Sequence, residues 1–320
     1  NGTAAEVAAA VDDVNTFSGT PTATLTSAHT LAELKAINNK LSGTLTLNDY
    51  TVALSGSTAD VKAALDGSFA AAYTGNVTIS DANSTNIAAA DISTIAGDTN
   101  GTLTVTNNIN ITGNSDVIAT AVGNVDAFSG TPTAALGDAH TLAELVTIND
   151  AISGTLTLTD YTVALNGSSA DVAAALDGTF ADTYSGTATL NNNHSLAQLV
   201  AINNGTTGNI TLSSNAVALT GSTSDVKAAL AGNVGAAYTG NIVLNDANGT
   251  GIAATDITTI ESDTTGTITV SNNINLTGTA TEIAAAVADV NTFSGTPTAT
   301  LSNAHTLAEL KAINNKLSGT

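Results

Sequence analysis

The first indications come from what the sequence lacks. It contains no cysteine, methionine, tryptophan or arginine. Without cysteine, a disulfide scaffold and thiolate metal sites are excluded. Six lysines stand against 27 aspartates and glutamates, which gives a formal net charge of −21. Nucleic acids and anionic membranes are bound by clusters of basic residues, so neither is expected as a partner. No apolar run approaches the roughly 20 residues that a membrane-spanning helix needs, so no membrane span is expected.

Large side chains and charges are also scarce. Aromatic residues make up 3% of the chain and charged residues 10%, whereas hydrophobic residues make up 42%. A disordered chain combines low hydrophobicity with high charge, and this chain does not. Much of the hydrophobic fraction is alanine and β-branched residues, which suit thin, closely packed layers. The composition therefore indicates a folded chain without the large-residue core of a compact domain.

Internal repetition is the strongest signal that is present. Residues 2–44 return as residues 278–320, an offset of 276, with differences only at positions 5, 7, 12, 26 and 27. Fixed-period repetition predicts a repeat architecture. We expect one continuous tandem-repeat solenoid over residues 1–320, and we expect this sequence to be a stretch of a longer protein. The predicted units are approximately 1–42, 43–100, 101–153, 154–207, 208–265 and 266–318.

Glycines divide these units further. Each of them opens a short threonine-rich stretch, and the intervals between them alternate between 22–26 and 29–32 residues. An interval of this size fits one coil of an α/β solenoid. The glycines are Gly19, Gly43, Gly75, Gly101, Gly130, Gly154, Gly186, Gly208, Gly240, Gly266, Gly295 and Gly319.

Each coil carries the patterns of a strand and a helix. Residues 44–47 alternate between threonine and leucine, as a half-buried strand does. Leu31, Leu34 and Ile37 form one apolar stripe at helical spacing. Thr30 and Glu33 have the spacing of a capping box, which recurs at 141/144, 195/198 and 306/309. The predicted fold class is an α/β repeat solenoid: a parallel β-sheet ladder with short helices packed on one side and about 22–32 residues per coil.

The four histidines carry little indication of chemistry. His29, His140, His194 and His305 all directly precede a predicted helix cap. A catalytic site is rarely copied from coil to coil, so we interpret them as packing residues at a helix entry. No nucleophile, metal or phosphate-binding motif stands in a suitable context. We expect neither an enzyme nor a bound cofactor, with calcium as the one ion to consider.

Recurring aspartates at predicted turns are the candidate calcium ligands. Carboxylates and loop carbonyls together suit a hard cation such as calcium. Aspartate in a turn or at a helix N-terminus also needs no ion to explain it. The candidates are Asp81, Asp91, Asp98, Asp246, Asp256 and Asp263.

A recurring threonine on the predicted strands is the candidate binding surface. Stacked in a parallel sheet, these residues would follow one another at about 4.8 Å. Such an array resembles the surfaces of ice-binding proteins, so a ligand-binding solenoid for ice or polysaccharide is the alternative function. Threonine is also simply a good strand former with a polar face. The ladder residues are Thr46, Thr78, Thr104, Thr157, Thr189, Thr211 and Thr269.

One family resemblance rests on two motifs. Residues 31–38 (LAELKAIN) followed by residues 42–47 (SGTLTL) resemble the repeat regions of giant secreted bacterial surface proteins, including those of marine cyanobacteria. The resemblance implies an extracellular or cell-surface location and a structural or adhesive role as a fibre, stalk or surface coat. Because the terminal coils of a solenoid expose unpaired strand edges, the expected partners are other copies of the protein or adjacent repeats of the same chain. The glycine-rich calcium-binding nonapeptide found in some such proteins is absent.

Overall fold

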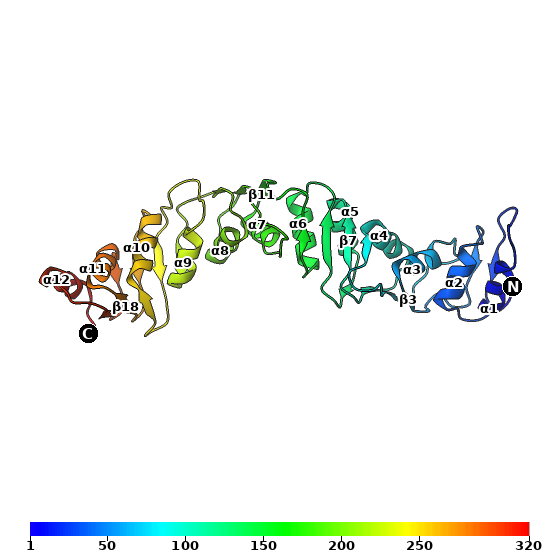
Figure 1. Cartoon of the computed structure of the whole chain (residues 1–320), viewed down its shortest axis with the longest axis horizontal. Coiled ribbons are helices and arrows are strands. Elements are labelled where there is room, and N and C mark those ends of the chain that lie inside the picture. Colours follow the sequence, from blue (N-terminus) through cyan, green and yellow to red (C-terminus); the bar gives the residue numbers. More distant parts are fainter. Residues whose placement is uncertain (320) are drawn as a thin grey trace. The chain divides into compact units, whose positions relative to one another are not determined.

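The structure, a computed structural model, describes residues 1–319 and has the fold of an α/β repeat solenoid. Short parallel strands alternate with helices along the whole described chain, as the sequence predicts (Figure 1). The chain divides into two compact units. The first holds residues 1–160 and 178–182, and the second holds residues 161–177 and those from Thr183 onward.

Twelve helices occur within residues 1–319, and in each unit consecutive helices pack against one another. In the first unit they are α1 (Ala4–Asp12), α2 (Leu31–Asn38), α3 (Thr58–Leu65), α4 (Ala89–Asp98), α5 (Ser115–Gly123) and α6 (Leu142–Ala151). In the second unit they are α7 (Ser169–Leu176), α8 (Leu196–Gly205), α9 (Thr223–Leu230), α10 (Ala254–Asp263), α11 (Ala280–Asp289) and α12 (Leu307–Lys316). None of the described helices is both long and apolar enough to cross a bilayer.

Strands of the first unit form three parallel sheets with the orders β1-β2, β3-β4-β6-β8 and β10-β9-β7-β5. The strands are β1 (Ala23–Thr24), β2 (Leu45–Thr46), β3 (Leu54–Gly56), β4 (Val77–Ile79), β5 (Asn86–Ala88), β6 (Leu103–Val105), β7 (Asn110–Gly113), β8 (Ala127–Phe128), β9 (Thr133–Leu136) and β10 (Leu156–Thr157).

Strands of the second unit also form three parallel sheets, with the orders β11-β12-β13, β14-β15-β17-β19 and β16-β18-β20. The strands are β11 (Leu165–Gly167), β12 (Ala188–Leu190), β13 (Ile210–Thr211), β14 (Leu219–Gly221), β15 (Ile242–Leu244), β16 (Gly251–Ala253), β17 (Ile268–Val270), β18 (Asn275–Gly278), β19 (Thr292–Phe293) and β20 (Thr298–Leu301).

The strand register shows how one coil lies on the next. Residues paired in the sheets are 22 to 26 positions apart, from Ala23 with Leu45 to Val77 with Leu103. The longer glycine-to-glycine intervals, of 29–32 residues, are therefore longer than the distance along the chain between two paired residues. In the interval from Gly43 to Thr74, for example, Leu45 pairs with Phe69 of the same interval. Within each unit, every coil is thus stabilised mainly by its immediate neighbours.

Capping boxes define the starts of half of the described helices. The hydroxyl of Thr30 accepts a hydrogen bond from the Glu33 amide, and the Glu33 carboxylate accepts one from the Thr30 amide. The predicted boxes at 141/144, 195/198 and 306/309 are confirmed, and two further boxes occur at 3/6 and 279/282. Each box satisfies amides that the first helical turn leaves without a partner.

Leucine, isoleucine, valine and alanine make up most of the core, together with the buried tyrosines Tyr73, Tyr184 and Tyr238. Leu34 and Ile37 of α2 are fully buried, and in β4 the buried Val77 and Ile79 flank the half-buried Thr78. Burying one such side chain stabilises the fold by about 1.5–3 kcal/mol. The predicted helical stripe and the period-2 strand pattern are therefore both present.

The coil-opening glycines allow close approach between backbones. A Cβ atom on Gly101 would overlap the carbonyl of Gly75, and one on Gly266 would overlap the carbonyl of Gly240. The same collision would occur at Gly43, where the atom met is the carbonyl oxygen of Pro21. These positions carry glycine because a neighbouring coil's main chain occupies the space of a side chain.

Candidate functional site

Two of the six candidate calcium ligands bind a neighbouring helix N-terminus. The carboxylate of Asp81 accepts hydrogen bonds from the Thr58 amide at 2.8 Å and from the Thr58 hydroxyl at 2.6 Å. Asp246 accepts the equivalent bonds from Thr223, at 3.0 and 2.6 Å. A carboxylate at a helix N-terminus is also favoured by the helix dipole. Both aspartates thus have protein partners that account for their position.

Two others form ion pairs between successive helices. Asp91 of α4 pairs with Lys62 of α3, and Asp256 of α10 pairs with Lys227 of α9. The hydrogen bond that the Lys62 ammonium donates to the Asp91 carboxylate raises the pKa of this ammonium above its usual value. Each partner keeps about a third of its side chain exposed or somewhat more. A pair this accessible is screened by solvent and contributes little to stability.

The last two candidates lie at the ends of helices. Asp98 ends α4, and its burial, aided by the nearby charge of Asp66, raises the pKa of its carboxyl group. Asp263 ends α10 and lines a cavity described below. Among the described residues, no group of three or more His, Asp or Glu side chains is placed to hold a metal ion. The structure therefore does not bring the six carboxylates together into a calcium centre.

The bonds of Asp81 and Asp246 belong to a regular contact that the sequence analysis missed. The amide of the first helical residue donates to a side chain located 23 positions later, in the next coil. Serine, aspartate and asparagine all serve as the acceptor. The six donor–acceptor pairs are Ala4–Ser27, Thr58–Asp81, Ser115–Asp138, Ser169–Asn192, Thr223–Asp246 and Ala280–Asn303. A search for Ser, Asp or Asn 23 residues after each predicted helix start would have found them.

The seven ladder threonines do not form one row. They lie in five separate sheets, and the longest direct runs among them are the pairs Thr78–Thr104 and Thr189–Thr211. Thr157 pairs with Ala135 instead. Thr157 and Thr211 are exposed and the other five are half-buried. Outward-facing threonine thus continues over no more than two of the ladder strands in succession, and Ser55, Ala127 and Asn166 occupy the paired positions in strands beside these pairs.

Histidine and tyrosine form a buried contact that spans two coils. The Nε2 atom of His29 lies 3.1 Å from the hydroxyl of Tyr73, and that hydroxyl lies 2.5 Å from the carbonyl oxygen of Val52. His194 and Tyr238 repeat the 3.1 Å contact in the second unit. Burial lowers the pKa of both histidines. The predicted packing role at a helix entry agrees with this burial, but the tyrosine partner was not predicted.

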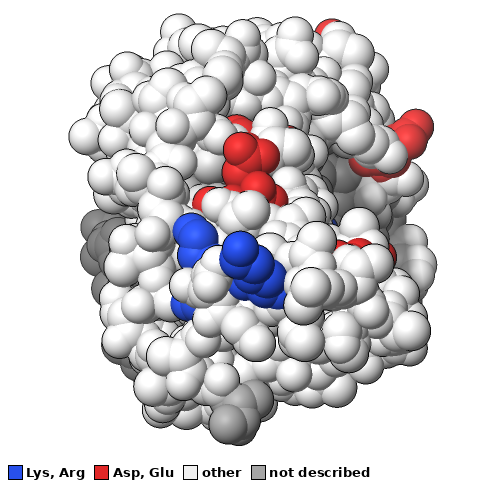
Figure 2. All heavy atoms as spheres, turned by 90° about the vertical axis from the view of Figure 1, so that its left-hand side faces the viewer, with Lys and Arg blue, Asp and Glu red and all other residues white. Residues whose placement is uncertain are grey.

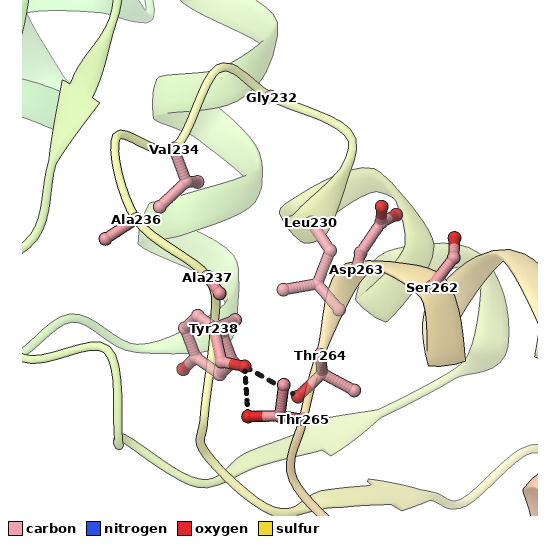
Figure 3. Close-up of a pocket in the computed structure, with 10 residues that line it drawn as sticks. All are labelled: Leu230, Gly232, Val234, Ala236, Ala237, Tyr238, Ser262, Asp263, Thr264 and Thr265. Atoms are coloured by element: carbon pink, nitrogen blue, oxygen red, sulfur yellow. Dashed lines mark hydrogen bonds between the residues drawn. The ribbon is translucent and has the colours of Figure 1, made fainter.

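Each unit contains a cavity. A cavity of about 240 Å³ lies between the end of α10 and the loop before Tyr238, where the hydroxyls of Thr264 and Thr265 reach the Tyr238 carbonyl (Figure 3). Its only ionisable side chains are Asp263 and the buried Tyr238. The second, of about 710 Å³, is a mostly apolar groove beside α1, lined by residues that include Val7, Val11 and Phe17. Neither cavity gathers an acid, a base and a nucleophile.

Comparison with known proteins adds no family. No protein-family model matches this chain, and no curated protein is similar enough to it to count as a match. The class of protein is therefore defined by its fold, an α/β repeat solenoid.

Proposed function

We propose that this chain is a structural repeat region of an extracellular or cell-surface protein, in which stacked coils build a fibre, stalk or surface coat. The role is non-enzymatic, and the repeats serve self-association and adhesion. The resemblance to giant secreted bacterial surface proteins supports this location and role.

One observation carries the proposal: polar groups that could serve chemistry are used to bind one coil to the next. The carboxylate of Asp81 binds the N-terminus of α3 in the preceding coil. The ammonium of Lys62 binds Asp91 of the following helix. The imidazole of His29 binds a tyrosine 44 residues further along the chain. Side chains committed in this way hold an architecture together, which is what a scaffold requires.

The alternative, a threonine-rich face that binds ice or polysaccharide, has weaker support. An ice-binding face needs a long and regular array, and here the directly paired ladder threonines come in twos. We therefore rank the structural role first.

Electron microscopy and fibre diffraction test this role. The purified chain is concentrated and imaged, with and without a calcium chelator. We expect uniform filaments and an axial reflection near the strand spacing of about 4.8 Å, unchanged by the chelator. Particles that stay single at every concentration would count against self-association. Filaments that dissolve in chelator would restore a calcium requirement.

The alternative is tested on the same sample by measuring ice recrystallisation and binding to a panel of polysaccharides. The matched variant replaces Thr78 and Thr104 by valine, which keeps the strand shape and removes two hydroxyls. An activity that this variant loses, in a sample without filaments, would favour the binding function over the structural one.

A further inference from the structure

The helix α12 presents a face whose partner can be identified from the rest of the chain. Leu307, its first residue, is 84% exposed. It is the one large hydrophobic side chain found strongly exposed among the described residues. Figure 2 views the molecule from the side on which α12 lies, and uncharged atoms cover most of that face. Charge repulsion therefore does not prevent a partner from docking on this face.

The super-repeat supplies an internal comparison. Residues 278–320 repeat residues 2–44 almost without change, so α12 has the sequence of α2 with two residues more. Leu307, Lys311, Asn314 and His305 correspond to Leu31, Lys35, Asn38 and His29. In α12 and its entry all four are exposed, whereas the four earlier counterparts are half-buried or buried.

The apolar contact comes first. Leu31 packs so closely on Gly56, just before α3, that a Cβ atom there would overlap the leucine Cδ2 atom. Leu196 at the start of α8 fills the same position over Gly221 in the second unit. In both units, therefore, the coil that contains α2 or α8 contacts the coil that follows it through a leucine packed on a glycine.

Three polar contacts accompany the leucine. Lys35 forms an ion pair with Asp60, and the Asn38 side-chain amide donates to the Ala64 carbonyl at 2.5 Å. His29 bonds to the Tyr73 hydroxyl at 3.1 Å. The asparagine and histidine contacts recur in the second unit at Asn203 and His194. All these partners lie in one segment, residues 43–74, or in its counterpart, residues 208–239.

We propose that the face formed by His305, Leu307, Lys311 and Asn314 is a docking surface for a coil of the 43–74 type. The occupant is defined chemically. It presents a glycine for the leucine, an aspartate for the lysine, a main-chain carbonyl for the asparagine and a tyrosine hydroxyl for the histidine. This inference rests on the proposed structural role, because it specifies which repeat the growing scaffold accepts at this face.

The test extends the full chain with a second copy of residues 45–100 after Thr320, which continues the repeat in register because Gly319-Thr320 matches Gly43-Thr44. The matched control carries Gly56→Leu in the appended copy alone, which fills the place of the leucine. A second control carries Tyr73→Phe in the appended copy. All three proteins contain the original 320 residues unaltered.

Two readouts report docking. With ¹⁵N-labelled histidine, we expect the extended chain to gain one slowly exchanging imidazole N–H signal, from His305, which the Tyr73→Phe control lacks. We also expect Leu307→Ala to lower the unfolding midpoint of the extended chain and to leave that of the original chain unchanged. Neither effect should appear in the Gly56→Leu control.

Two results would overturn the proposal. One is an extended chain in which His305 exchanges as fast as before and Leu307→Ala has no effect. The other is self-association of the original chain that Leu307→Asp abolishes, because a second copy would then be the occupant. Filament formation is measured separately by microscopy. If the appended coil docks on the α12 face but no filaments form, the structural role is refuted, whereas the preference of this face for a coil of the 43–74 type still holds.

Discussion

The imidazole of His29 donates its Nε2 proton to the hydroxyl of Tyr73, which in turn donates to the carbonyl of Val52. The two contacts are 3.1 and 2.5 Å long. Because a hydroxyl has one proton and the carbonyl can only accept, the proton between His29 and Tyr73 must come from the imidazole. The Nδ1 atom of His29 is buried and has no hydrogen-bond partner. The site therefore accommodates a neutral histidine, and a second proton would be placed where nothing accepts it.

Acidification should destabilise the protein through His29 and His194. Burial lowers the pKa of both, and for His29 the charges of Asp49 and Glu33 offset part of this effect. The folded state then binds fewer protons than the unfolded state, in which a histidine has a pKa of about 6.5. The stabilisation is fully present above that value and is lost as the pH falls below it towards the lowered pKa of the folded state. Chemical unfolding at pH 7.5 and pH 5 measures this loss.

Carboxylates also titrate over part of this range, so the histidine contribution is read as a difference between variants. Replacing His29 and His194 by glutamine keeps a donor for tyrosine and removes the titrating ring, so the drop in unfolding free energy should shrink. His305→Gln is the control, because His305 is exposed. A double variant that loses as much stability on acidification as the parent would contradict this account.

Tyr73→Phe should cost about 1–3 kcal/mol of unfolding free energy. The change deletes the hydroxyl alone, and leaves the half-buried Val52 carbonyl and the buried His29 N–H without this partner. Tyr50→Phe is a suitable comparison, because Tyr50 is half-buried and its hydroxyl accepts one bond, from the Leu47 amide at 3.1 Å. We expect the smaller loss there. Equal losses in the two variants, measured by urea unfolding, would mean that burial of the Tyr73 hydrogen bonds to His29 and Val52 adds nothing to their contribution to stability.

Much of the fold could be predicted because its signals are local. The capping pair Thr30 and Glu33 lies within one helical turn, and the alternation around Thr78 lies within one strand. Repetition then turns each local pattern into several independent observations. The candidate metal site could not be assessed in this way, since whether Asp81 and Asp91 share a centre depends on which coil contacts each one.

The missed contacts are those that cross between coils. His29 and Tyr73 are 44 residues apart, and Thr58 and Asp81 are 23 apart. Neither spacing corresponds to a helix or strand period, so neither contact follows from the pattern of one element, and the 23-residue spacing emerges only when all the helix starts are compared. The threonine ladder failed for the same reason: the step between paired residues varies from 22 to 26, and a recurring motif need not fall on the same sheet.

Asp81→Ala should cost about 0.5–2 kcal/mol, the usual effect of losing a helix cap. Asp81→Asn should cost little, because Asn192 accepts the equivalent amide bond from Ser169 at 2.8 Å. The control is Asp12→Ala, at an exposed position where the other copy of the repeat has Ala288. Thermal unfolding gives the three values, and an alanine variant as stable as the asparagine variant would remove the capping role.

The same variants test calcium. If Asp81 and Asp246 act as caps, added calcium should shift the unfolding midpoint equally in the parent and in the Asp81→Asn, Asp246→Asn double variant. A rise that occurs in the parent alone would instead assign these carboxylates to a calcium site.

Gly101→Ala should be strongly destabilising, by about 1–3 kcal/mol or more, because the added methyl group would overlap the main chain of Gly75 in the preceding coil. Main chain cannot rotate away as a flexible side chain can, so the two coils would have to separate. Gly97→Ala, four residues earlier, is the matched control. Gly97 lies in α4 with nothing within 4 Å of the new Cβ atom, and alanine there should stabilise the helix by about 0.5–1 kcal/mol. Opposite signs for the two changes in unfolding free energy, measured by urea unfolding, would establish that the coil-opening glycines are needed for close backbone contact. If both variants were stabilised, the space between the coils would be large enough for a methyl group.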